Sequence, residues 1–289
     1  GCKQGSQGKT TITDRAGTLV TISPKQPERI ISTAPSNTEI IVDLGLADKL
    51  IAVDTYSAGV AGIQGDLVLI DFAYPDVERI IGLDPDIIIA AGHNQTVSGD
   101  DPFKLVKEAG IGVVYIPTST SIEGIYEDIR FIAEVLQVTE QGAELIEPMK
   151  AEVATIAAIG ASIPVKKSVY IEISPFPFIV TCGEGTYLNQ MIAIIGAENI
   201  FAGEKGWFSP AVEAIIDRNP DVILTLVNYT DTPLEEIKGR AGFETINAVQ
   251  RDEVYPIEAN AASRPSHHVI AALWQMARAV YPEVYAEKN

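Results

Sequence analysis

The 289-residue sequence has few of the side chains on which metal centres and redox sites depend. It contains three His and two Cys, and the His occupy positions 93, 267 and 268. Three His, two of them adjacent, are too few for the cage of several ligands that holds a bare zinc or manganese ion. We therefore expect no metal site built from protein ligands and no resident cofactor.

Basic residues and long apolar runs are also scarce. The chain has 21 Lys and Arg against 39 Asp and Glu, which gives a net charge of -18. This charge repels the phosphates of nucleic acids and disfavours broad adhesion to an anionic membrane face. No apolar run approaches the roughly twenty residues that span a bilayer. The sequence therefore predicts neither a nucleic-acid partner nor a transmembrane helix.

The short motifs of common catalytic sites are missing as well. We find no GxxxxGK, GxGxxG, GxSxG, HExxH or CxxC pattern. Enzymes of the doubly wound α/β class usually carry one of these motifs, so we expect a binding protein without chemistry of its own. The alternative from another class is a doubly wound enzyme, for which Glu172 with His93 is the one titratable pair that we can suggest.

What the sequence does contain is an internal repeat. Val77–Ile89 and Val212–Leu224 share a Glu at the second position, paired Ile residues, a Pro-Asp step and a closing apolar run. The Pro disfavours helix in the residue before it, and the apolar run is typical of a strand buried on both faces. Repeated helix, turn and parallel strand predict an α/β fold of two doubly wound lobes with a ligand cleft between them.

Apolar periodicity places the other elements. In the first half it predicts strands over 19–22, 50–53, 86–90 and 113–116, and helices over 37–46, 76–82 and 103–109. In the second half it predicts strands over 169–173, 222–227 and 253–257, a polar loop over 228–233, and helices over 187–195 and 267–281. Helical runs from 121 and from 140 to about 159 lie between the halves with no strand between them. The second run is typical of a rigid lobe connector, and an ordinary packing helix is the alternative.

The start of the chain differs from the rest. Gly-Cys is followed by a polar stretch without core-forming residues up to Thr11, which resembles a bacterial lipoprotein cut just before a lipid-bearing Cys2. A structural or tag-derived Cys is the alternative. Cys182 follows an apolar run, and we expect a buried thiol there. The expected domains are a tether over 1–16, an N-terminal lobe over 17–138, a connecting helix over 139–161 and a C-terminal lobe over 162–289.

From about Pro27 to Pro282 the chain resembles the lipid-anchored solute-binding proteins that feed ABC importers of vitamin B12, iron-siderophores and heme. The motifs that carry the resemblance are Pro27-Glu-Arg-Ile-Ile-Ser, the two Glu helices, Tyr187-Leu-Asn-Gln-Met with Gly196-Ala-Glu-Asn-Ile, Trp207, and Ser263-Arg-Pro-Ser-His-His. It implies two lobes joined by one long helix, and a monomer outside the cytoplasmic membrane, at the cell surface or in the periplasm, with its lipid as the sole membrane contact.

The resemblance also implies a cargo and its contacts. An iron(III) chelate, either a siderophore or heme, is the expected ligand, and cobalamin or another corrinoid is the alternative. Open parallel sheets bind ligands beyond the carboxyl ends of their strands, and positions similar to Tyr56, Trp207 and Arg264 line the cleft in relatives. The expected ligand-binding residues are Tyr56, His93, Asn94, Trp207, Phe208, Tyr229, Arg264, His267 and His268.

Each of these residues also has a structural alternative. The aromatic side chains are equally at home in a core, and Arg264 can bond backbone carbonyl groups instead of an anionic ligand edge. His93 suits an axial bond to heme iron or an ordinary loop hydrogen bond. His267 and His268 stand where relatives often have Pro-Arg, which lowers the positive charge expected there.

Two Glu residues are expected to dock on the transporter. In the family, a Glu at the position of Glu78 and of Glu213 meets an Arg-bearing pocket on each subunit of the permease dimer. A pseudo-symmetric protein can meet a two-fold partner when both halves present the same charge. The alternative is that each Glu only complements the dipole of its helix.

Overall fold

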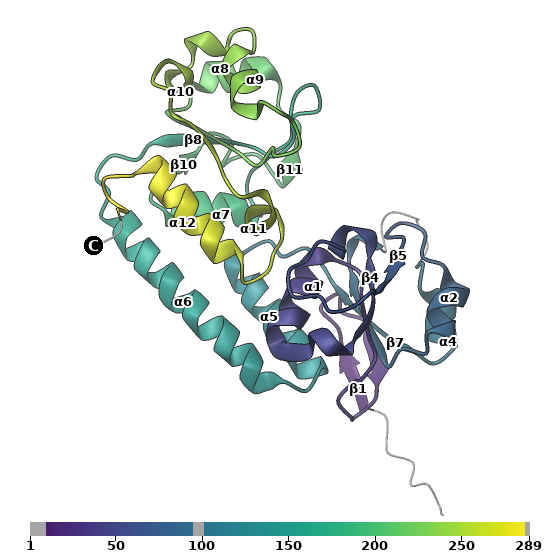
Figure 1. Cartoon of the computed structure of the whole chain (residues 1–289). Coiled ribbons are helices and arrows are strands. Elements are labelled where there is room, and N and C mark those ends of the chain that lie inside the picture. The colour runs from purple at the N-terminus through teal and green to yellow at the C-terminus, as the bar shows by residue number, and fades with distance from the viewer. Residues whose placement is uncertain (1–9, 95–100, 287–289) are drawn as a thin grey trace, which may run out of the picture. The chain divides into compact units, whose positions relative to one another are not determined.

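The structure is a computed structural model of the chain and describes residues 10–94 and 101–286. It divides into two compact units (Figure 1). Unit 1 comprises Gly1–Thr118 and Ile125–Glu147, and unit 2 comprises Ser119–Gly124 and Pro148–Asn289. The division falls at Pro148 inside the long helix α6 (Thr139–Ala161). The ligand cleft between the lobes stays a prediction of the sequence.

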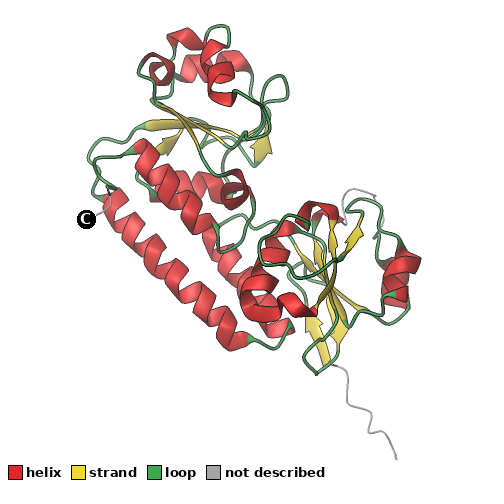
Figure 2. Ribbon diagram, in the orientation of Figure 1, coloured by secondary structure: helices red, strands yellow, loops and turns green. Residues whose placement is uncertain are grey.

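Unit 1 is built on a parallel five-stranded sheet (Figure 2) of order β5-β4-β3-β6-β7. Its strands are β3 (Ile30–Ser32), β4 (Leu50–Asp54), β5 (Val68–Ile70), β6 (Ile87–Ala91) and β7 (Gly112–Ile116). The chain fills one side of β3 first and then crosses to the other, so the topological switch point lies between β3 and β6. Its helical segments are α1 (Pro35–Ile41), the π-helical turn Val42–Leu46, two short 3-10 turns, α2 (Val77–Gly82), α4 (Lys104–Glu108) and most of α5 (Ile122–Val135).

Unit 2 repeats the design with a parallel four-stranded sheet of order β10-β8-β12-β13. The strands are β8 (Ser168–Glu172), β10 (Glu198–Asn199), β12 (Val222–Thr225) and β13 (Val254–Pro256), and here the switch point lies between β8 and β12. A short antiparallel ribbon pairs β9 (Thr181–Cys182) with β11 (Trp207–Phe208). The helices are α7 (Tyr187–Ile194), α8 (Val212–Arg218), α9 (Pro233–Gly239), α10 (Asn247–Gln250), α11 (Ala259–Ser263) and α12 (Val269–Val280).

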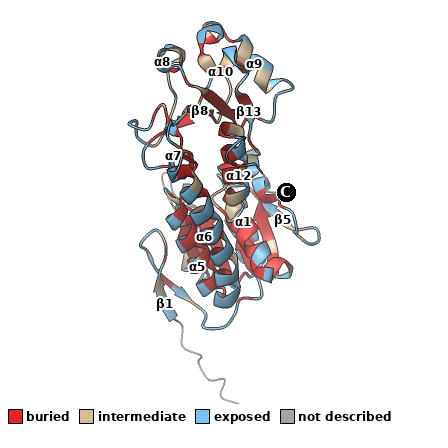
Figure 3. Ribbon diagram, turned by 90° about the vertical axis from the view of Figure 1, so that its left-hand side faces the viewer, coloured by how far each residue is buried: buried red, intermediate tan, exposed pale blue. Residues whose placement is uncertain are grey.

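The central strands are buried on both faces, as their unbroken apolar runs predict (Figure 3). Every residue of β6 and β7 is buried, and so is every residue of β12. Helix α5 has one buried face, formed by Ile122, Ile125, Ile129 and Ile132. The α/β fold with parallel sheets is therefore confirmed.

Among the residues that the structure describes, no helix combines the length and apolar character needed to cross a membrane.

The sequence repeat corresponds to a repeat of tertiary contacts. Asp84 and Asn219, the residues before the two Pro, both take left-handed backbone conformations, with φ of 47° and 45°, because a following Pro disfavours right-handed helix and short polar side chains tolerate this region. The Asp after each Pro then ties the segment to the neighbouring strand. Asp86 Oδ2 accepts from the backbone N–H groups of Glu28 and Arg29, and Asp221 Oδ2 accepts from the backbone and hydroxyl of Ser168.

The last part of the predicted tether, residues 10–16, is folded. β1 (Thr10–Thr13) pairs antiparallel with β2 (Leu19–Ile22). The buried Asp14 accepts from Ala16 N and Thr18 N in the turn and from Tyr115 N on β7. Arg15 also binds Asp128 and Glu127 on α5. A strand made mostly of polar residues, such as β1, is not predicted by a search for apolar runs.

Other boundaries shift by a few residues. Gly45 interrupts the helical turn Val42–Leu46 with a φ of 82°, and Gly196 follows α7 with a φ of 83°. Helix α9 begins at Pro233, inside the predicted polar loop, and α12 begins at Val269 with His268 as its N-cap.

Candidate functional site

Unit 1 presents aromatic side chains at the carboxyl edge of its sheet. Tyr56 follows β4 and is 69% exposed, and Phe72 and Tyr74 follow β5. The rings of Tyr56 and Phe72 meet edge to face, with centroids 5.9 Å apart. We call Tyr56, Phe72 and Tyr74 the unit 1 rim. It offers aromatic surface to a flat ligand at the edge where α/β proteins bind small molecules.

His93 and Asn94 follow β6 at the switch point, but they differ in accessibility. His93 is exposed, and its Nδ1 lies 3.4 Å from the hydroxyl of Thr118. Asn94 is only 2% exposed. Its Oδ1 accepts from Thr33 Oγ1 and from Ala91 N, and its Nδ2 donates to the carbonyl of Phe72. The amide of Asn94 is therefore buried and bonded within the protein, whereas His93 reaches the surface.

In unit 2, Trp207 and Phe208 lie on opposite faces of the short strand β11. Trp207 is 43% exposed and meets the ring of the buried Tyr187 edge to face at 5.8 Å. Phe208 instead packs against the core, with its ring 5.4 Å from that of Phe201. Neighbouring strand residues point to opposite faces, so Trp207 is exposed and Phe208 packs against the core of the unit. The ligand contact of Trp207 stays a prediction.

The remaining predicted contacts of unit 2 lie on two loops. Tyr229 follows β12 and is exposed. Arg264 is half-buried at the end of α11. The rings of His267 and His268 lie 4.1 Å apart at the start of α12, with His267 half-buried and His268 exposed. The structure thus brings the two His together and places Tyr229 on a separate loop.

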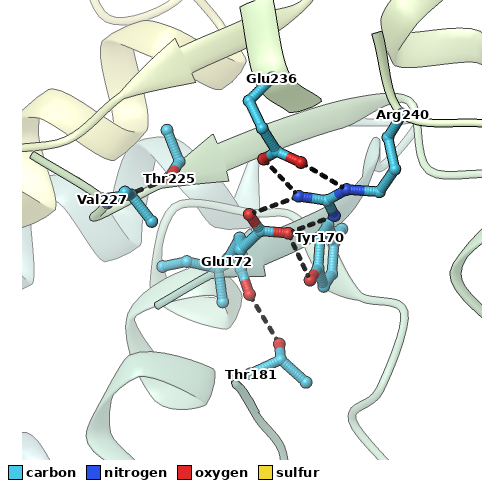
Figure 4. Close-up of polar contacts among 8 residues, drawn as sticks. Tyr170, Glu172, Thr181, Thr225, Val227, Glu236 and Arg240 are labelled. Atoms are coloured by element: carbon cyan, nitrogen blue, oxygen red, sulfur yellow. Dashed lines mark hydrogen bonds and ion pairs between the residues drawn. The ribbon is translucent and has the colours of Figure 1, made fainter. Parts of the chain in front are cut away.

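Glu172, the suggested acid of the enzyme alternative, is fully buried in an ion network (Figure 4). Arg240 Nη1 and Nη2 donate to its two oxygens at 2.7 and 3.0 Å. Arg240 also binds Glu236, and Tyr170 donates its hydroxyl to Glu172. Burial opposes the charge of Arg240, but the bonds to Glu172 and Glu236 raise its pKa above its ordinary value. Arg240 therefore stays charged and holds Glu172 as a structural carboxylate.

Several aromatic residues at these edges, all exposed except the half-buried Phe72, were not predicted as ligand contacts. They are Phe72 and Tyr74 in unit 1, and Phe176 and Phe178 in the loop between β8 and β9 of unit 2. Phe178 is 81% exposed. We call Phe176, Phe178, Trp207 and Tyr229 the unit 2 rim. The sequence offered one usable signal, since an aromatic loop that directly follows a buried strand lies at the edge where ligands bind.

Glu78 and Glu213 occupy equivalent places in the two units. Each is the second residue of its helix and is exposed. Glu213 also lines a surface cavity of about 720 Å³, together with Phe176, Glu235, Glu236 and Arg240. The N-terminal caps differ, because Asp76 caps α2 with its side chain and Ala211 cannot cap α8. Both helices thus present an exposed carboxylate at their second position, although only α2 has a side-chain N-cap.

The two cysteines have different outcomes. Cys182 is buried on β9, and burial raises the pKa of its thiol to about 12 although a hydrogen bond with Thr186 lowers it. A thiol with this pKa is unreactive at neutral pH. Cys2, the predicted lipidation site, lies outside the described residues.

Comparison with known proteins agrees with the two-unit fold. The sequence profile of the periplasmic binding protein family matches residues 30–261. An uncharacterized ABC transporter substrate-binding lipoprotein, YvrC of Bacillus subtilis, is 34% identical over 96% of this chain and 87% of its own. A solved structure from Staphylococcus epidermidis, described as a possible iron-binding (periplasmic solute-binding) protein, is 31% identical, with a TM-score of 0.78 over 89% of this chain and 100% of its own.

A third relative is the periplasmic vitamin B12-binding protein of Vibrio cholerae. Its structure is 25% identical, with a TM-score of 0.73, and the match covers 92% of this chain and all of that one. Family profile, sequence and structure point the same way, and the resemblance inferred from the sequence motifs is confirmed. The chain belongs to the periplasmic binding protein family.

Proposed function

We propose that this protein captures an iron(III) chelate, a siderophore complex or heme, and delivers it to the permease of an ABC transporter. The coarser role, substrate binding for an ABC transporter, follows from the family and from the substrate-binding lipoprotein that is 34% identical. The identity of the chelate is our proposal. The observation that carries it is the presence, in each unit, of exposed aromatic side chains at the carboxyl edge of a parallel sheet.

The two rims favour a large, flat, partly apolar ligand. Aromatic faces give large contact areas with planar ring systems, and small polar solutes are normally held by converging hydrogen-bond donors and acceptors instead. The described relative from Staphylococcus epidermidis is a possible iron-binding protein, which supports iron as the metal of the cargo. In a siderophore the chelator supplies the iron ligands, so the protein needs none of its own.

A fluorescence titration tests this proposal. The chain has two Trp, and the Trp274→Phe variant leaves Trp207 as the single reporter. We expect one class among ferric hydroxamates, ferric catecholates and heme to quench Trp207 saturably at micromolar concentration or below, after correction for absorbance. The Trp207→Phe variant, which retains Trp274, is the control for non-specific quenching. Absence of saturable quenching by all three classes would contradict the proposal.

A corrinoid is the second candidate. Vitamin B12-binding proteins of Yersinia species are 29% identical over 76% of this chain, and a corrin ring also suits aromatic rims. Cyanocobalamin therefore belongs in the same titration. Saturable quenching by cyanocobalamin, with none by the iron chelates, would replace the first candidate by the second.

We further propose that Glu78 and Glu213 dock the protein on the permease dimer. Both carboxylates are exposed on the first turn of helices that are equivalent in sequence and in tertiary contacts. The cavity beside Glu213, with Glu235 and Glu236 on its wall, suits a cationic side chain of the partner. Charge complementarity of this kind sets orientation and association rate more than affinity.

Uptake measurements with charge-reversed variants test the docking proposal. The Glu78→Arg/Glu213→Arg variant is expected to abolish uptake of the bound chelate and to leave its dissociation constant unchanged. Glu108→Arg/Glu244→Arg is the matched control, because it reverses one exposed Glu in each unit away from these helix starts. Normal uptake by the first variant, or equal loss in the control, would contradict docking through Glu78 and Glu213.

Cys2 is proposed as the lipid-bearing residue, which places the protein outside the cytoplasmic membrane on a short tether. The support is the polar sequence around Cys2 and the described lipoprotein relative. Cells that make a Cys2→Ala variant are expected to release the protein from the membrane fraction. Retention in that fraction would show another anchor.

We also propose that the protein has no catalytic activity and acts as a monomer. Its relatives bind and transport solutes, and Glu172 is committed to Arg240. Recovery of each chelate unchanged after prolonged incubation tests the first statement, and sedimentation at micromolar concentration tests the second.

A further inference from the structure

The aromatic residues of the unit 1 rim share an unusual form of support. The backbone of each aromatic residue forms a hydrogen bond with a polar side chain of the same unit. Asp54 Oδ2 accepts from Tyr56 N at 3.0 Å, Asn94 Nδ2 donates to the Phe72 carbonyl at 2.7 Å, and Asp71 Oδ1 accepts from Tyr74 N at 2.7 Å. Asp54 and Asn94 are buried, whereas Asp71 is exposed. The two rings in mutual contact, Tyr56 and Phe72, are therefore the two with buried supports.

Asp54 is the end of a buried chain of hydroxyl groups. Ser57 donates to its Oδ1, and the hydroxyl of Thr38 lies 3.1 Å from Ser57 Oγ and 2.8 Å from Ser32 Oγ. All four side chains are at most 1% exposed. Buried polar groups are costly unless they are satisfied, and a fully satisfied network fixes one local geometry. The segment that carries Tyr56 is thus tied to β3 and α1.

Asn94 forms the second support from the other side of β3. Its Oδ1 accepts from Thr33 Oγ1 at 2.7 Å and from Ala91 N at 3.1 Å. This leaves the Nδ2 group directed at Phe72, in a loop that follows the far strand β5. Ser32 and Thr33 are neighbours at the end of β3, so one strand end anchors both supports. β3 is the central strand of the unit 1 sheet.

We propose that Asp54 and Asn94 are positioning residues, which hold the rings of Tyr56 and Phe72 in their ligand-binding arrangement before the ligand arrives. This rests on the proposed function, in which the unit 1 rim contacts the flat face of a chelate. Neither residue touches the ligand. A site that is organised in advance avoids the entropy cost of ordering its side chains on binding. Burial also raises the pKa of Asp54, although its hydrogen bonds with Ser57 and Tyr56 lower it.

Fluorine NMR of the ligand-free protein tests the positioning itself. Site-specific 4-fluorophenylalanine at position 56 or 72 reports the order of each ring. Asp54→Ala is expected to broaden or shift the signal at 56, and Asn94→Asp, which replaces one donor by an oxygen, the signal at 72. Titration with the chelate that binds wild type is expected to show about tenfold weaker affinity for each variant.

Two further variants separate positioning from charge and from fold stability. Asp54→Asn retains an acceptor for Tyr56 N, and its amide can donate to Ser57, so we expect it to rescue most of the affinity. Thr38→Val removes a hydroxyl from the same network without touching the bonds to Tyr56 or Phe72. We expect it to lower the melting temperature and to change the fluorine signals and the affinity much less than Asp54→Ala does, because the bond from Tyr56 N to Asp54 remains.

The outcomes distinguish this inference from the proposed function. Unchanged fluorine signals in folded Asp54→Ala and Asn94→Asp would overturn the positioning, whether or not a chelate binds. Wild-type affinity in both would overturn it as well, and so would equal effects in Thr38→Val. Failure of every chelate to bind wild type, with perturbed fluorine signals in the variants, would overturn only the proposed function. Asn94→Asp supplies an independent test if Asp54→Ala does not fold.

Discussion

The two units present similar edges with different means of support. In unit 1, the rim is held by neutral hydroxyl and amide groups around the carboxylate of Asp54. In unit 2, the end of β8 is held by an ion network in which Arg240 joins Glu172 and Glu236 and lies over the rings of Phe176 and Phe243. In contrast, both units place an exposed Glu, the proposed docking residue, at the second position of a helix, although the N-caps of these helices differ.

A binding protein that docks on a transporter has to fit two different partners, the permease dimer and the ligand. A two-fold partner can meet the same surface twice, and in the proposed docking Glu78 and Glu213 supply that surface on equivalent helices. An asymmetric ligand makes no such demand, so the two rims can differ. Under this proposal, the units are alike where the partner is symmetric and differ where the ligand is not.

The largest effect is expected from breaking the ion network of unit 2. Arg240→Met leaves the fully buried Glu172 without its cation, so we expect about 3–5 kcal/mol loss in the free energy of unfolding. Urea unfolding followed by circular dichroism measures it. Glu236→Gln is the control with a small effect, because the Glu236 side chain is 39% exposed. A loss below about 1 kcal/mol for Arg240→Met would contradict the importance of this network.

A smaller loss is expected from the hydroxyl network of unit 1. Ser57→Ala removes the partner of one Asp54 oxygen and leaves a buried acceptor unsatisfied. We expect the free energy of unfolding to fall by about 1–3 kcal/mol, in the same urea experiment. A fall equal to that of Arg240→Met would mean that the two kinds of support do not differ in strength.

The free energy of unfolding should depend on pH through Asp54 of unit 1. Burial raises the pKa of Asp54 above its ordinary value of 3.8, so the folded state takes up a proton at a higher pH than the unfolded chain. Its contribution to stability is therefore largest at low pH and is lost as the pH rises through the folded pKa. We expect wild type to gain stability relative to Asp54→Asn as the pH is lowered from 7 toward 4. A constant difference between the two proteins across this range would show that Asp54 does not titrate this way.

The smallest effect concerns Cys182 beside Trp207 in unit 2. Its thiol is buried and its pKa is about 12, so the thiolate that reacts is scarce at pH 8. In a Cys2→Ser variant, we expect a disulfide reagent to modify the native protein at least about a hundredfold more slowly than the urea-unfolded protein. Rapid modification of the native protein would show that the β9–β11 ribbon opens readily.

The sequence predicted the parts of the fold that local patterns encode. The two Glu helices, their ends before Pro and the buried strands all follow from residues within a short window, so α2, α8, β6 and β12 were predicted. The left-handed backbone before each Pro was not predicted. The strand β1 was missed because Thr10–Thr13 is mostly polar, although its partner β2 was predicted over 19–22. Helix α9 was missed where Pro233 follows a polar loop.

The site was less predictable, because it depends on contacts between distant residues. Trp207 and Phe208 are neighbours in the sequence, and only their strand shows that one is exposed and the other packs on Phe201. Asn94 was predicted to contact the ligand, and the structure shows that its side chain is buried and bonded to Thr33 and Phe72. The proposed role of Asp54 depends on its bond to Tyr56 N, within a network that includes Ser57 and Thr38 from different elements.

We propose that Tyr56 of unit 1 and Trp207 of unit 2 each contribute to binding of the chelate. Isothermal titration calorimetry of wild type, Tyr56→Ala and Trp207→Ala with the chelate identified by fluorescence tests it most directly. Both side chains are substantially exposed, so each substitution should leave the melting temperature nearly unchanged. We predict that each raises the dissociation constant about tenfold or more. Wild-type affinity in both variants would contradict the account.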